Sequence, residues 1–211
     1  MVGVVPWLVV LLVDGVGGEY FGVGGRNGVV EYHNQIRSQL AKGDFISRGN
    51  RRKPTGSNIL KMVWNQSLAE SAENYARKNP KTHSMKPGVG ENLYWHWSTN
   101  PGEMGRYGSM AAESWINEFK NLDWEDTVLS QKLFSSGVGH ATQMVWATTN
   151  QVGCGYSQFS EIHQPTHRSI SKIVVVCHYY PKGNYLNEPI YDVGPACSKC
   201  TKCEYTSSLC T

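Results

Sequence analysis

Six cysteines are the residues whose spacing in this sequence most directly suggests chemistry. None lies before Cys154, and four crowd together near the C-terminal end as Cys197, Cys200, Cys203 and Cys210. The Cys-x-x-Cys-x-x-Cys run resembles part of a zinc or iron–sulfur site, but Cys210 comes too late for the ferredoxin spacing. In an exported chain such thiols form disulfides instead. The sequence therefore predicts a disulfide-bonded tail, with three pairings open to its four cysteines.

The histidines include one pair with the spacing of metal ligands. His163 and His167 are four residues apart, a spacing that places two ligands on one face of a helix. Pro165 lies between them and breaks such a helix, so we interpret the segment as an exposed loop. We expect His33 to bond locally on the first helix and His178 to be a structural residue on a strand. Spacing alone therefore identifies no histidine metal site.

Composition and charge exclude several classes of protein. The 211 residues carry a net charge of only +3, and the basic residues form no stripe interleaved with aromatic ones, which argues against nucleic-acid binding. An apolar content of 40% allows a sizeable core. The length suits one domain with an appendage better than two full domains.

The N-terminal segment indicates export. Val2 to Val13 is a nearly unbroken apolar run, too short to span a bilayer but long enough for the core of a signal peptide, which we assign to residues 1–18. The run lacks a basic start and contains Pro6, and a buried strand is the alternative. Seven glycines follow between Gly15 and Gly28. We expect residues 19–28 to be a flexible linker, and we reject the dinucleotide-binding loop that they partly resemble. No later segment is apolar enough to cross a membrane.

Four segments have the periodicity of amphipathic helices. The first follows Asn27 as its N-cap, the second follows Ser67, which forms a capping box with Glu70, and the fourth begins near Gly139. The apolar positions that define the four helices are Val30, Ile36 and Leu40; Leu68, Ala72, Tyr75 and Ala76; Met110, Ala111, Trp115, Phe119 and Leu122; and Ala141, Met144 and Val145.

Two β-rich runs come after the helices, at residues 151–159 and 172–180. The run Ile173 to Val176 is typical of a central strand that is buried on both faces. Helices early in the chain and strands late in the chain indicate an α+β fold in which helices pack on a sheet.

Two longer motifs carry a family resemblance. Gly139 to Trp146 (GHATQMVW) and Val174 to Tyr185 (VVVCHYYPKGNY) resemble the two signature sequences of the CAP superfamily, and Val152 to Gly155 between them is also typical. Matching positions upstream, in the family's order, are His33-Asn34 with Arg37, Trp64, Thr82-His83-Ser84, Gly90 to Leu93, and Trp115 with Glu118. Because this ordered set is specific, the chain is identified as a member of the superfamily, and its tail resembles the cysteine hinge of nematode venom-allergen-like proteins.

The resemblance implies a three-layer α/β/α sandwich, which we place at residues 29–190, followed by a short cysteine-rich, hinge-like tail at residues 191–211. Ala141 stands where the family commonly has an aromatic residue, a change expected to widen the local cavity. The implied disulfides are Cys154–Cys177 across the sheet, and Cys197–Cys203 and Cys200–Cys210 in the tail.

The resemblance also gathers four cleft residues that spacing does not connect, namely His83, Glu91, Glu118 and His140. Two imidazoles can hold a divalent cation such as Zn²⁺, with carboxylates binding it or its water. Two protein ligands with water would bind the cation weakly. The alternative is a polar network that braces the cleft without metal.

From these features we expect a secreted, non-enzymatic protein that binds a lipid, either a sterol or a fatty acid, and acts on extracellular host proteins, with a role in immune modulation. The fatty-acid groove is expected between the first and fourth helices. A second candidate is a sterol-binding loop with Tyr94, Trp95 and Trp97, for which core packing or a cleft rim is the simpler interpretation.

Two rival functions remain open at this point. One is a metal-dependent hydrolase that uses the tetrad, although no nucleophile is indicated. The other is a purely receptor-binding effector. Asn65-Gln66-Ser67 is a glycosylation sequon at a helix start, where Asn65 can also serve as a cap. The sequence leaves the oligomeric state open.

Overall fold

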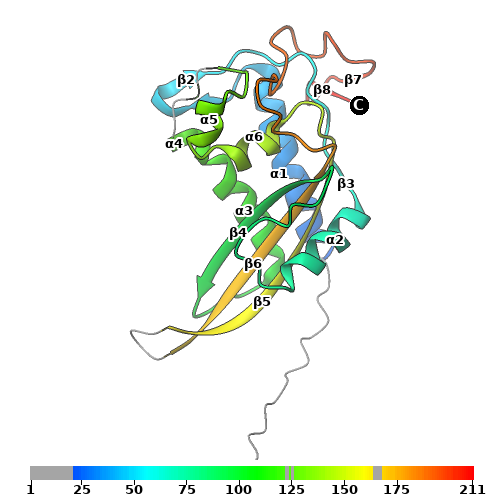
Figure 1. Ribbon diagram of the computed structural model, residues 1–211. Coiled ribbons are helices and arrows are strands. Elements are labelled where there is room, and N and C mark those ends of the chain that lie inside the picture. Colours follow the sequence, from blue (N-terminus) through cyan, green and yellow to red (C-terminus); the bar gives the residue numbers. More distant parts are fainter. Residues whose placement is uncertain (1–20, 122–123, 125, 164–167) are drawn as a thin grey trace, which may run out of the picture.

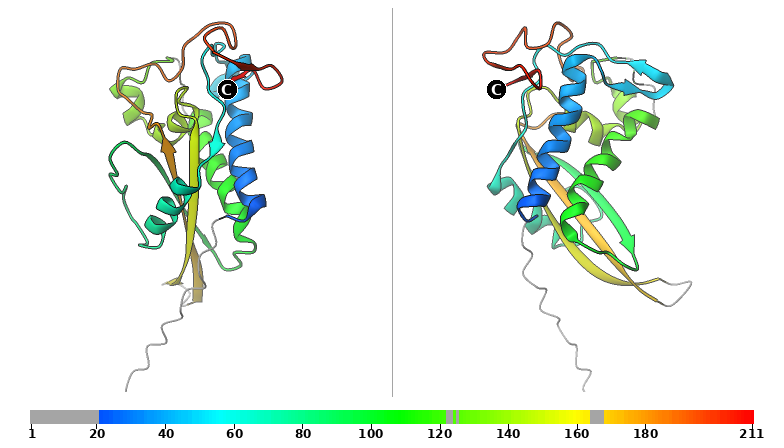
Figure 2. Two further views of the ribbon diagram at one scale, coloured as in Figure 1. Left: turned by 90° about the vertical axis from the view of Figure 1, so that its right-hand side faces the viewer. Right: turned by 180° about the vertical axis from the view of Figure 1, so that it is seen from behind.

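The computed structural model describes residues 21–121, 124, 126–163 and 168–211. It is an α+β fold with a four-stranded sheet between two layers of helices, as predicted (Figures 1 and 2). The predicted signal peptide and His167 lie outside the described residues. The elements are α1 Val23–Lys42, β1 Ile46–Ser47, η1 Arg48–Asn50, β2 Arg51–Arg52, β3 Val63–Trp64, α2 Gln66–Ala76, β4 Gly90–Ser98, η2 Met104–Arg106, α3 Tyr107–Ile116, α4 Glu118–Asn121, α5 Gln131–Ser135, α6 Gly139–Val145, β5 Gln151–His163, β6 Arg168–Tyr180, β7 Cys203–Glu204 and β8 Leu209–Cys210.

The sheet has the strand order β3-β5-β6-β4, so β6 lies inside it, as its apolar run predicted. Side chains of β6 alternate between the two faces. Val174 and Val176 pack on the side covered by α2, whereas Ile173 and Val175 join the larger core under α1 and α3. The left view of Figure 2 shows α2 on one side of the sheet and α1 and α3 on the other.

Strand β4 was not predicted. It pairs antiparallel with β6 along its whole length, and it contains the aromatic residues that we considered for a sterol-binding loop. That interpretation is wrong because the three residues lie on a strand. Tyr94 packs against the main core, Trp95 packs on the α2 side, and Trp97 is 49% exposed.

Helix α1 begins earlier than the sequence indicated. It starts at Val23 after Gly22, so the predicted flexible linker is helical from Val23 onward and Asn27 is not the cap. Two of the glycines serve close packing here: a Cβ on Gly25 would meet the backbone of Gly105 at 3.0 Å, and one on Gly28 would meet Ser109 Oγ at 2.7 Å. At these two positions glycine therefore allows the close approach of α1 to η2 and α3.

Helix α2 is capped by Asn65 and not by Ser67. The Asn65 side-chain oxygen accepts from the Leu68 N–H at 3.0 Å, and its amide nitrogen donates to Gln151 Oε1 at 2.5 Å. The third predicted helix is divided into α3 and α4 at Asn117, and the short helix α5 was not predicted. Helix α6 begins at Gly139, as expected.

The buried Arg37 side chain connects α1 to the end of α6. It is 0% exposed, and burial lowers the pKa of its guanidinium to about 9, so the charge persists at neutral pH. The guanidinium donates five hydrogen bonds of 2.7–3.0 Å, to the carbonyl oxygens of Leu60, Met144, Trp146, Ala147 and Thr149. Because α6 ends at Val145, the positive charge satisfies carbonyls at the negative end of that helix.

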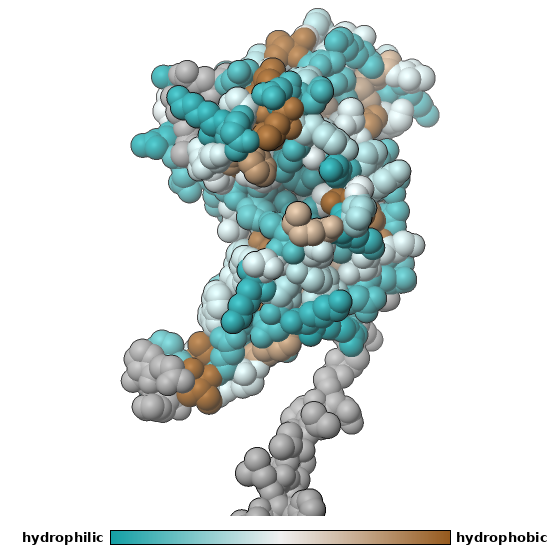
Figure 3. Space-filling view, in the orientation of Figure 1, coloured by the Kyte–Doolittle hydropathy of each residue, from teal (hydrophilic) through white to brown (hydrophobic). Residues whose placement is uncertain are grey.

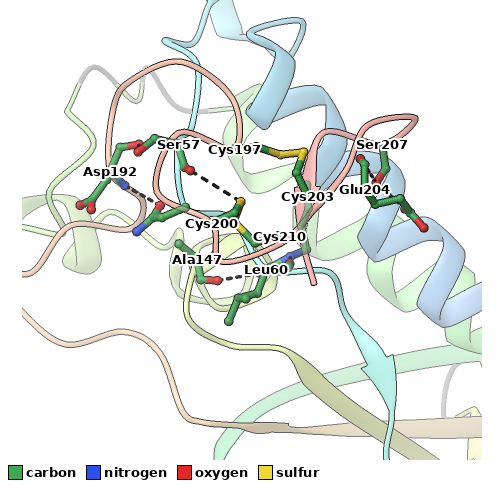
Figure 4. Close-up of a disulfide and its surroundings, with 12 residues drawn as sticks. Ser57, Leu60, Ala147, Asp192, Cys197, Cys200, Cys203, Glu204, Ser207 and Cys210 are labelled. Carbon is green, nitrogen blue, oxygen red and sulfur yellow. Dashed lines mark hydrogen bonds between the residues drawn. A yellow bond between two sulfur atoms is a disulfide. The ribbon is translucent and has the colours of Figure 1, made fainter.

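The C-terminal tail packs against the domain. Its disulfides are Cys197–Cys203 and Cys200–Cys210 (Figure 4). A third disulfide, Cys154–Cys177, joins the directly opposed strands β5 and β6, and all three pairings are those that the resemblance implies. Leu209 is fully buried, and the Cys210 carbonyl accepts from the Lys61 N–H at 2.8 Å. Among the described residues, no helix has both the length and the apolar character to span a bilayer.

Candidate functional site

The four tetrad residues come from four separate segments and meet in one cleft. His83 lies in the loop between α2 and β4, Glu91 on β4, Glu118 at the start of α4, and His140 on α6. The two imidazole ring centres are 6.2 Å apart. All four residues line a cleft of about 610 Å³, and Figure 3 shows the surface hollowed between the upper helices and the sheet. The grouping that the resemblance implied is therefore present in space.

Glu91 is the most constrained member of the tetrad. His83 Nδ1 donates to its Oε1 at 2.9 Å, the Ser84 N–H donates to the same oxygen at 2.8 Å, and His178 Nε2 donates to its Oε2 at 2.9 Å. Burial alone would raise the pKa of Glu91, but these hydrogen bonds outweigh it and hold the pKa well below its usual range. The carboxylate is therefore ionised at neutral pH and acts only as an acceptor.

His140 is held in a similar way by Glu118. Its Nδ1 donates to Glu118 Oε1 at 2.6 Å, and the Ala141 N–H donates to Oε2 at 3.0 Å. The Trp115 indole stacks on the His140 ring at 6.0 Å between centres and an interplanar angle of 20°. Because each carboxylate engages an Nδ1, each imidazole keeps its Nε2 for another partner.

The two imidazoles are close enough to share a divalent cation after a small movement. A tetrahedral cation bound at ~2.1 Å to both Nε2 atoms places the ring centres roughly 5.3 Å apart, so the rings, 6.2 Å apart here, would have to approach by about 1 Å. A carboxylate on Nδ1 fixes the tautomer and raises the basicity of a metal-binding histidine. Within the described part of the chain, no three histidine, cysteine or acidic side chains converge as a complete metal site. The residues would thus supply two ligands, with Glu91 and Glu118 behind them.

The rest of the cleft combines apolar side chains, the amides of Asn92, Gln143 and Asn184, and a basic margin. Met85 is 85% exposed and Phe134 is 40% exposed, and both line the cleft. Other lining residues include Pro87, Val89, Lys86 and Lys182, and no serine, threonine or cysteine is among those described. Ala141 is fully buried and is not among the residues that line this cleft, so the expected widening of a local cavity stays a prediction.

The other predicted positions lie elsewhere. A fatty-acid groove was expected between α1 and α6. At that place the buried Arg37 guanidinium of α1 donates to the carbonyl oxygens of Met144 and Trp146 at the end of α6. His163 is exposed at the end of β5 and not on a loop. His33 bonds locally to the Val29 carbonyl, as expected, and also contacts Tyr179 Oη. His178 is a buried residue of β6, as expected, and it also contacts Glu91, which the pairing of β4 with β6 places opposite it.

The fold, the paired histidines and the disulfides define a CAP domain. Residues 30–179 match the cysteine-rich secretory protein family, and the chain belongs to this family.

Its relatives include venom allergen 5.02 of Dolichovespula maculata, which is 35% identical over 175 residues, covering 79% of this chain and 76% of that protein. Among solved structures, BmVAL-1 superposes with a TM-score of 0.80 at 32% identity, covering 92% of this chain and 97% of that one. The structure titled NaASP2 with Zn²⁺ superposes with a TM-score of 0.79 at 29% identity, covering 92% of this chain and 98% of that one.

Proposed function

We propose that this CAP protein is a secreted, non-enzymatic binding protein whose cleft holds a divalent cation and a lipid, and that it acts on extracellular partners. The observation that carries the proposal is the pair of facing imidazoles, 6.2 Å apart, each with Nδ1 fixed by its own carboxylate. The relation to a structure that contains Zn²⁺ supports the choice of cation. The family's secretory character supports an extracellular location.

The cleft lining supports a lipid ligand. His83 and His140 would hold the cation, which when bound supplies positive charge for a polar oxygen of the ligand. Met85, Phe134 and Val89 supply apolar surface for the rest of the molecule. The absence of a serine, threonine or cysteine among the described lining residues gives no support to covalent hydrolysis.

The test is a competition assay on disulfide-intact protein with labelled palmitate and labelled cholesterol, in the presence of Zn²⁺ or of EDTA. We expect saturable binding of at least one lipid, weakened by EDTA and by the double substitution His83→Ala/His140→Ala. The control His163→Ala removes an exposed histidine at the end of β5 and should bind like the wild type.

Binding of neither lipid would overturn the lipid part of the proposal and favour a receptor-binding effector. Zn²⁺-dependent cleavage of a peptide or an ester, lost in His140→Ala with the fold intact, would overturn the non-enzymatic part.

A further inference from the structure

His178 is a buried histidine directly behind the cleft. It lies opposite Glu91 in the pairing of β6 with β4, and its side chain is 1% exposed. Its Nε2 donates to Glu91 Oε2 at 2.9 Å, while His83 Nδ1 donates to the other oxygen at 2.9 Å. One carboxylate therefore joins a buried histidine to a histidine that faces the cleft.

We propose that His178 is a positioning residue of the cation site: through Glu91 it fixes the ring and the tautomer of His83. The effect on cation affinity rests on the proposed function, whereas the effect on His83 itself does not. A carboxylate whose second oxygen is tied to a buried donor cannot rotate freely, so its first oxygen stays in place for His83.

The two halves of the site differ in a way that makes this support necessary. The His140 ring is stacked on Trp115 and lies on helix α6. The His83 side chain is 48% exposed and lies on a loop, and its one ring contact among the described residues is with His140. The Glu91 side chain is 7% exposed and that of Glu118 is 19% exposed. His83, the less constrained of the two histidines, thus depends on Glu91, the more deeply buried of the two carboxylates.

Packing alone does not account for a histidine at this position. His178 Nδ1 is buried and has no hydrogen-bond partner among the described residues. An unsatisfied buried polar atom costs free energy that an apolar side chain of similar size would avoid. The contact of Nε2 with Glu91 is the gain that offsets this cost.

The experiment compares His178→Leu, which cannot donate to Glu91, with His178→Gln, whose terminal amide can. Two quantities are measured: the Zn²⁺ dissociation constant, by competition with a chromophoric chelator, and the His83 tautomer in metal-free protein, by ¹⁵N NMR of the imidazole. We expect His178→Leu to weaken Zn²⁺ binding about 10- to 100-fold. The same substitution should convert His83 from a fixed Nδ1–H form to a mixture of tautomers. We expect His178→Gln to retain both properties.

The matched control is Val176→Ala, on the same strand and the same face, which removes buried apolar volume without touching Glu91. It should lower the free energy of unfolding and leave both readouts unchanged. If His178→Leu does not fold, His178→Asn replaces it, because its shorter amide does not reach Glu91. An unchanged tautomer and unchanged Zn²⁺ affinity in these variants would overturn the inference. If the wild type binds no Zn²⁺, the proposed cation site fails, and the tautomer alone decides the role of His178.

Discussion

Replacement of Arg37 by lysine tests how the domain holds α6, the helix that carries His140. The guanidinium is fully buried, and all five of its N–H donors bond to backbone carbonyls. A lysine ammonium has three donors, so Arg37→Lys removes at least two of these five hydrogen bonds. The carbonyls of Trp146 and Ala147 also accept from the N–H groups of Thr149 and Leu60, so these two keep a partner without the guanidinium. Each lost hydrogen bond to a charged donor contributes about 1.5–3 kcal/mol, which predicts a loss of about 3–6 kcal/mol in the free energy of unfolding.

The assay is urea unfolding at pH 7 of oxidised protein, followed by tryptophan fluorescence and circular dichroism. The control is Arg52→Lys, because Arg52 is 67% exposed and pairs with Asp44, which is 58% exposed. An exposed pair of this kind contributes little, and we expect the control to change stability by less than about 0.5 kcal/mol. A loss below about 1 kcal/mol in Arg37→Lys would refute the reasoning that the hydrogen bonds of the guanidinium stabilise this part of the domain.

Three further predictions concern the rest of the domain. Burial, assisted by the charge of Arg37, lowers the pKa of His33 to about 4 from an ordinary 6.5, so the unfolded chain binds a proton that the folded one excludes. The free energy of unfolding should therefore fall by roughly 3 kcal/mol from pH 7 to pH 4. Urea unfolding of His33→Gln between pH 7 and pH 4 should lack this part of the loss. Replacing Cys154 and Cys177 together by alanine opens a cross-link with a sequence separation of 23 and should cost about 3 kcal/mol in urea unfolding; an unchanged midpoint would contradict this. Asn65→Ala should cost about 1 kcal/mol by loss of the α2 cap, whereas Asn65→Asp should retain the cap, and equal stability of the two variants would argue against the capping role.

The parts of the fold that the sequence predicted are those with an uninterrupted local pattern. The apolar block Ile173 to Val176 indicated an interior strand, and the structure places it inside the sheet. Strand β3 has only two residues, Val63 and Trp64, which is too short for any alternation to be recognised. Glycine content misled the assignment before Gly28, because composition does not distinguish a flexible linker from a helix packed closely on its neighbour.

The candidate site could not be predicted from local sequence patterns. Its four residues lie on a loop, a strand and two helices, and no periodicity relates positions brought together by tertiary packing. Family resemblance supplied the grouping. It did not supply His178, because that contact depends on the register of β4 against β6, and β4 was not predicted as a strand.

The docked tail has a consequence for the order in which this chain folds. Cys210 N–H donates to the Ile59 carbonyl, and Leu209 fills the core, although all of the central sheet lies between these two segments in the sequence. During synthesis, the segment around Ile59 therefore emerges long before the residues that complete its backbone pairing. Until those residues arrive, its polar groups and the apolar surface beneath Leu209 are open to water or to a chaperone. A fragment ending at residue 190 would lack Leu209 and Cys210, and the core surface and the Ile59 carbonyl that they contact would have no such partner in it.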